Sequence, residues 1–110
     1  MWLAFGHSPG MDIEFEAPLW EWHGGKASWF FVSLPADVAS DIRFASAGRP
    51  RAGFGSIKVT VRIGRQTWRT SLFPDKASGS YLLPIKKSVR VGESLAVGDR
   101  ARVALTLVDI

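Results

Sequence analysis

The chain has 110 residues, 46% hydrophobic and 22% charged, which excludes a disordered tail and a fibrous repeat and suits one domain with its own core. The absence of cysteine excludes disulfides, a thiolate nucleophile and a cysteine-ligated zinc site, and favours a cytoplasmic location. The excess of 14 Lys and Arg over 10 Asp and Glu gives a net charge of +4, a modest bias towards anionic ligands or nucleic acid.

Residues 1–11 show neither a strand period nor a helix period. We expect a poorly ordered leader there, with Met11 as a possible true start, and a single domain over residues 12–110. The leader lacks the basic start and long apolar stretch of a signal peptide. No apolar run approaches the roughly 20 residues of a membrane span, so we expect no membrane contact.

The patterned part begins with a predicted hairpin and a helix. Apolar residues alternate along residues 12–21, which predicts a strand with one buried face. Gly24-Gly25 then predicts a turn into a second strand over residues 27–33. Pro35 is suited to a first helical position, and the apolar stripe that follows predicts a short helix up to about Ala45.

The second half of the chain contains the clearest hairpin. The stretch 46–55, rich in glycine, proline and arginine, has the composition of a mobile loop. Residues 57–63 alternate strictly, Gly64-Arg65 supplies a two-residue turn, and residues 66–72 return. A short strand over 80–84, a short helix over 86–91 and a last strand over 100–108 complete the pattern.

The order of these elements indicates a mainly β fold with few parallel crossovers. An open, flat sheet of six short strands would leave aromatic side chains and two strand edges exposed. We therefore predict a small closed β-barrel of six to seven strands, capped by the two short helices.

The second hairpin predicts which side chains share a face. Its turn pairs Val61 with Trp68 and Val59 with Thr70, which gives an apolar inner face. The opposite face is basic and rich in hydroxyl groups, without an acidic residue: Lys58, Thr60, Arg62, Thr67, Arg69 and Ser71, with Arg65 at the tip. Its four cations, Lys58, Arg62, Arg65 and Arg69, are candidates for binding phosphate groups or nucleic acid. The alternative is a solvated face that keeps the hairpin soluble.

The first hairpin carries four aromatic side chains that are candidates for a ligand site or an interface: Trp20, Trp22, Trp29 and Phe31. A turn at Gly24-Gly25 places Trp20 opposite Trp29 and Pro18 opposite Phe31. The hairpin is apolar on both faces, so something must cover the second one. Cover by one of the chain's own helices is the plainer interpretation, and a ligand pocket or a patch that closes a dimer is the functional one.

The sequence offers little for catalysis. His7 lies in the leader, His23 lies at a hairpin tip, and no Ser–His pairing is apparent. The segment Gly53-Phe54-Gly55-Ser56 lacks the Gly-Lys-Ser/Thr ending of a phosphate-binding loop and precedes a strand. We therefore expect no metal site, no cofactor and no enzymatic activity.

Longer stretches of the sequence carry a family resemblance. The most specific are Gly53-Phe54-Gly55-Ser56, residues 68–76 and residues 79–84, with residues 29–32 and Leu34-Pro35 in support. The chain from about residue 15 onward resembles the bacterial domain of unknown function 1905 family. The resemblance implies a double-split β-barrel capped by helices, a class that also contains DNA-binding domains of the AbrB and MazE type. It implies no established activity.

These observations together predict a non-enzymatic binding or interaction module, either a monomer or a homodimer. Two alternatives stay open, and a distinct measurement separates each of them. Nucleic-acid (DNA) binding through the basic hairpin face predicts affinity that falls steeply with salt. A self-associating structural barrel predicts a dimer closed by the tryptophan face.

Overall fold

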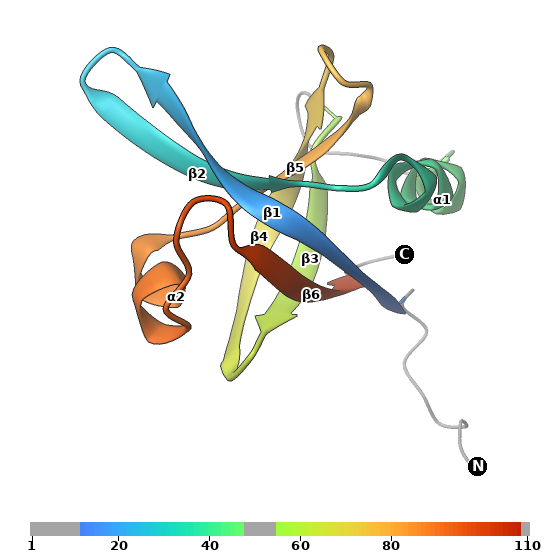
Figure 1. Ribbon diagram of the computed structural model, residues 1–110. Coiled ribbons are helices and arrows are strands. Elements are labelled where there is room, and N and C mark those ends of the chain that lie inside the picture. The colour runs from blue at the N-terminus through green and yellow to red at the C-terminus, as the bar shows by residue number, and fades with distance from the viewer. Residues whose placement is uncertain (1–11, 48–54, 109–110) are drawn as a thin grey trace.

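A computed structural model describes residues 12–47 and 55–108, whose six strands close into one antiparallel barrel with two helices (Figure 1). The elements in chain order are β1 (Asp12–Gly24), β2 (Ala27–Ser33), α1 (Ala36–Ser46), β3 (Ile57–Ile63), β4 (Gln66–Asp75), β5 (Ser80–Pro84), α2 (Lys87–Gly92) and β6 (Arg100–Leu107). The predicted mainly β, closed architecture is confirmed. The predicted leader, with Met11, and most of the predicted loop lie outside the described residues.

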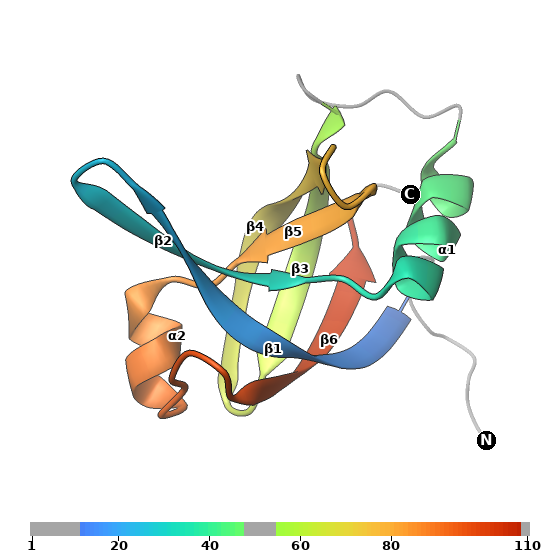
Figure 2. The same ribbon diagram turned by 45° about the horizontal axis from the view of Figure 1, so that its top comes forward.

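Two long strands close the barrel, because each of them changes partner along its length. The order around the barrel is β1-β2-β5-β4-β3-β6. The first part of β1 pairs with β6, and from Leu19 onward β1 pairs with β2. Strand β4 pairs with β3 up to Leu72 and with β5 from Phe73. Figure 2 shows both strands running from one side of the barrel to the other.

The barrel interior is filled by the alternate, apolar side chains of the strands. Branched residues from all six strands are almost completely buried: Leu19, Val32, Val59, Val61, Leu72, Leu83, Val103 and Leu105. Because side chains alternate in direction along a strand, this inner set leaves the other side chains of each strand on the outer face of the barrel. The inward direction predicted for Val59 and Val61 is therefore confirmed.

The register of the second hairpin is as predicted. Val61 lies opposite Trp68 and Val59 opposite Thr70, with the turn at Gly64-Arg65. Gly64 adopts a φ of +57°, a left-handed conformation that two-residue hairpin turns require and that glycine takes at little cost.

The register predicted for the first hairpin is wrong by one turn position. Gly25, with a φ of +64°, and Lys26 form the turn, while Gly24 remains the last residue of β1. Trp22 therefore lies opposite Trp29, and Trp20 opposite Phe31. Moving the turn by one position shifts the pairing by two residues, so the predicted division of side chains between the faces still holds.

The two helices cap opposite ends of the barrel (Figure 1). Helix α1 follows Pro35, which is its N-cap residue rather than its first helical residue, and buries Val38, Ala39 and Ile42. The shorter α2 buries Val89. Neither of these described helices has the length and apolar composition needed to cross a bilayer.

We predict that Val61→Ala lowers the free energy of unfolding by about 2–3 kcal/mol, because it removes two fully buried methyl groups and leaves a cavity. Val97→Ala is the matched control, since Val97 is 55% exposed, and it should change stability by less than about 0.5 kcal/mol. Urea unfolding followed by far-UV circular dichroism measures both. Equal effects of the two substitutions would contradict the inward placement of β3.

Candidate functional site

The aromatic side chains of the first hairpin line an open groove on the outer face of β1, β2 and β5. Trp22 and Trp29 are 50% and 54% exposed. Trp20 and Phe31 are half-buried beside them, with ring centroids 5.3 Å apart. We call this the aromatic groove, a hollow of about 540 Å³ lined by Trp20, Trp22, Trp29, Phe31, Asp75, Ala77 and Leu82. The structure thus brings the four predicted aromatic residues together.

The predicted cover by a helix is wrong for the described part of the chain. No residue of α1 or α2 lines the aromatic groove. The reason is the position of the helices at the two ends of the barrel, whereas the β1–β2 hairpin extends away from it (Figure 1). An exposed patch of large aromatic side chains of this kind marks a binding surface more often than an inert one.

Two local contacts hold the indole rings in place. The Nε1–H of Trp20 donates a hydrogen bond of 2.9 Å to the Ser33 hydroxyl. The ring of Trp22 lies so close to Gly24 that a Cβ at position 24 would overlap it. A hydrogen bond therefore orients the inner tryptophan, and the missing side chain of Gly24 leaves space for the outer one.

Among the described residues, Asp75 is the only ionisable one that lines the aromatic groove. Its Oδ2 accepts a hydrogen bond of 2.7 Å from the Ser78 hydroxyl, and its Oδ1 accepts one of 3.3 Å from the Ala77 N–H. Within residues 12–47 and 55–108, no Lys, Arg or His side chain forms an ion pair with this carboxylate. The groove therefore combines aromatic faces with one negative charge.

Barrel closure places acidic residues beside the basic face of the second hairpin. On this outer face, Arg62 of β3 lies opposite Ala104 of β6, and Ala104 lies opposite Glu14 of β1. Two strand spacings of about 4.8 Å each thus separate the backbones of Arg62 and Glu14. These two residues line one shallow hollow together with Asp12. The hairpin face itself has no acidic residue, as predicted. The barrel surface next to it does, because Asp12 and Glu14 of β1 lie beside Arg62.

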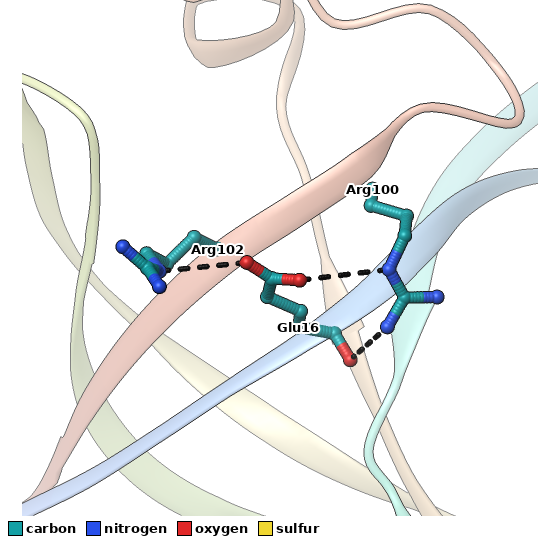
Figure 3. A network of polar contacts seen from close by, with 3 residues as sticks. All are labelled: Glu16, Arg100 and Arg102. Atoms are coloured by element: carbon teal, nitrogen blue, oxygen red, sulfur yellow. Dashed lines mark hydrogen bonds and ion pairs between the residues drawn. The ribbon is translucent and has the colours of Figure 1, made fainter.

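Glu16 of β1 also contacts Arg100 and Arg102 of β6. Figure 3 shows the Glu16 carboxylate between Arg100 and Arg102, with N–O distances of 3.6 and 3.5 Å. Arg100 Nη2 also donates a hydrogen bond of 3.3 Å to the Glu16 carbonyl oxygen. Such exposed pairs contribute about 0–1 kcal/mol to stability, so their main effect here is on the distribution of charge.

The four predicted anion-binding cations do not line one common hollow. Arg65 lies at the turn, where its backbone N–H donates to the Glu93 carboxylate at 3.2 Å. Arg62 lies on the side of Asp12 and Glu14. Lys58 and Arg69 instead line another hollow, together with Val59, Thr70, Ser71 and Val108, and no acidic residue of the described ranges lines it.

A second groove gathers cations that the sequence analysis did not bring together. We call it the basic groove, a hollow of about 350 Å³ lined by Ser28, Trp29, Phe30, Trp68, Arg69, Thr70, Pro84, Ile85, Lys86, Lys87 and Arg90. In the part of the chain that the structure describes, four cations and no acidic residue line it. The Lys86-Lys87 pair and the i, i+3 position of Arg90 were visible in the sequence, but their approach to β2 and β4 depends on barrel closure.

The hairpin also contains a Ser–His contact, contrary to expectation. The Ser28 hydroxyl and Nδ1 of His23 are 3.2 Å apart, and Nε2 of His23 lies 3.5 Å from Glu21. The imidazole is 72% exposed, so water competes with the serine hydroxyl and the carboxylate for its two nitrogen atoms. Among the residues that the structure describes, no group of three or more His, Cys, Asp or Glu side chains is arranged to hold a metal ion.

Comparison with protein families identifies the chain. The model of the domain of unknown function DUF1905 matches residues 15–105, which include both grooves. The chain belongs to this family. No match was found among the curated proteins. The resemblance inferred from the sequence is therefore confirmed, and the DUF1905 domain has the six-stranded barrel described above.

For the DUF1905 domain we predict that Gly24→Ala displaces the Trp22 ring, because the new methyl group would occupy its position. Since φ of Gly24 is not positive, the backbone accepts alanine, and the cost in stability should stay below about 1 kcal/mol. The indole N–H signal of Trp22 in a two-dimensional NMR spectrum should move, while that of Trp68 stays. In a Trp22→Ala background the same substitution should have no effect on stability, and a remaining cost would contradict the proposed contact.

Proposed function

We propose that this DUF1905 domain is a non-enzymatic binding module whose aromatic groove takes organic cations, such as an alkylated ammonium group. The observation that carries this proposal is the composition of the groove, which is lined by four aromatic residues and, among residues 12–47 and 55–108, by Asp75 as the only ionisable one. Faces of indole and phenyl rings attract cations through their quadrupole, and a carboxylate adds to that attraction.

The size and exposure of the groove support this proposal. A hollow of about 540 Å³ lies within the range of roughly 300–1,000 Å³ that is usual for small-molecule sites. Trp22 and Trp29 are each about half exposed, so a ligand that covers them removes apolar surface from water. The ammonium part and the apolar part of one ligand would both find partners here.

The charge of Asp75 supports a cation rather than an anion or a second copy of the chain. In the described residues its carboxylate accepts hydrogen bonds from a hydroxyl and an N–H but has no cationic partner. A twofold dimer through this face would bring the same carboxylate from both copies into one apolar interface. Burial of unpaired like charges is unfavourable, and we therefore propose a monomer.

Four further proposals concern the fold and the setting. The partner changes along β1 and β4 support the double-split type of barrel. Kinship with the AbrB and MazE type of domain and a bacterial source remain predictions from the family resemblance. A cytoplasmic location remains a prediction from the absence of cysteine.

The test uses benzyltrimethylammonium and its uncharged carbon isostere, neopentylbenzene. We expect the cation to shift the indole N–H signals of Trp20, Trp22 and Trp29 and to leave that of Trp68, which lies outside the aromatic groove, in place. The isostere has the same shape without the charge and should bind about two- to fivefold more weakly. Asp75→Asn preserves the acceptor for the Ala77 N–H. It should weaken binding of the cation but not binding of the isostere.

Three results would overturn the proposal. Equal affinity for the cation and its isostere would contradict the role of the positive charge in binding. An absence of shifts with either probe would contradict binding in the aromatic groove. A wild-type dimer in sedimentation that Trp29→Ser dissociates would show that a second copy covers the face. Circular dichroism of each variant confirms that it is folded.

A further inference from the structure

The basic groove lies beside the aromatic groove and has the opposite charge, with Trp29 common to both. We propose that it binds a nucleotide unit, that is, a phosphate group joined to a flat heterocyclic base. This inference does not depend on the aromatic groove, because the cations that carry it lie on β4, at Lys86 and on α2.

The positive charge of the basic groove supports an anionic ligand. Arg69, Lys86, Lys87 and Arg90 line a single hollow of about 350 Å³, and no acidic residue of the described segments lines it with them. In the described part of the chain none of the four forms an ion pair. Cations that converge in a concave site without counter-charges create a local positive potential, which attracts anions and is neutralised when one binds. A phosphate group can satisfy several of these donors at once.

The aromatic residues that line the basic groove support a ligand with a flat ring. The Arg90 guanidinium stacks 3.7 Å from the Phe30 ring centre, and its Nε donates to the Ile85 carbonyl oxygen at 3.3 Å. Lys86 Nζ lies 5.9 Å from the ring centre of Trp68. These contacts position two cations against ring faces. Trp29, which is 54% exposed, remains available for a base to stack on, as in proteins that bind single strands.

The volume of the basic groove supports a ligand of about one nucleotide. A hollow of about 350 Å³ is at the lower end of the range for small-molecule sites, and it suits one nucleotide rather than a duplex. A free mononucleotide and one unit of a single strand present the same phosphate and base. The geometry therefore identifies the shared chemistry, and the experiment distinguishes the two sources.

The test titrates the intact domain with deoxyadenosine monophosphate, with deoxyadenosine and with a short single-stranded oligodeoxyadenylate. We expect the monophosphate or the oligonucleotide to shift the indole N–H signals of Trp68 and Trp29. Deoxyadenosine lacks the phosphate and should bind at least about tenfold more weakly, since charge-assisted contacts contribute most of the attraction. Binding of the monophosphate indicates a free nucleotide, and binding of the oligonucleotide alone indicates a single strand.

The matched variants separate this groove from the predicted basic face of the hairpin. Arg69→Glu and Lys87→Glu should each weaken binding about tenfold, because both residues line the groove. Arg62→Glu makes the same charge change on the same hairpin outside the groove, and it should change affinity less than about twofold. All three positions are exposed, so the variants should fold, which circular dichroism verifies.

Equal weakening by Arg62→Glu and Arg69→Glu would overturn the proposal in favour of general attraction to the positive hairpin face. Affinity for deoxyadenosine equal to that for the monophosphate, or an absence of Trp68 shifts with every probe, would also overturn it. The Trp20 and Trp22 signals report the aromatic groove alone, so failure of this proposal is distinguishable from failure of the proposed function.

Discussion

The pairing of β1 and β4 with two neighbours each is the constraint on which the rest of this structure depends. Because β1 passes from β6 to β2 and β4 passes from β3 to β5, six short strands close without a continuous exposed edge. Closure also decides where a strand lacks a neighbour. Strand β2 pairs with β5 only over its last three residues, from Phe31 to Ser33, so its first half extends beyond that partner.

Both candidate sites lie around this half of β2. The outer face of the hairpin leaves Trp22 and Trp29 half exposed, which forms the aromatic groove. The neighbouring space between β2, β4, α2 and the residues before α2 forms the basic groove. Trp29 contributes to both, with Asp75 on one side and Arg69 on the other. The net charge of +4 therefore describes neither groove, because barrel closure has separated the local charges.

The sequence determined a large part of the fold because the relevant information is local. Alternation with a period of two assigned Val59 and Val61 to the interior, and Gly64-Arg65 determined the register of the second hairpin. In the first hairpin, two adjacent glycines allowed two positions for the turn, and pattern alone did not choose between them. The faces were nevertheless predicted correctly, because the two registers differ by two residues.

The family, the barrel class and the presence of an aromatic face and a basic face followed from the sequence by itself. Only the tertiary structure decided that the helices leave the aromatic face open, that Glu14 lies near Arg62, and that Lys86, Lys87 and Arg90 join Arg69. The physical reason is that a strand's period depends on its own residues, whereas its neighbours around a barrel depend on contacts between residues far apart in the chain. Those distant pairings, rather than any local motif, place the charges of each groove.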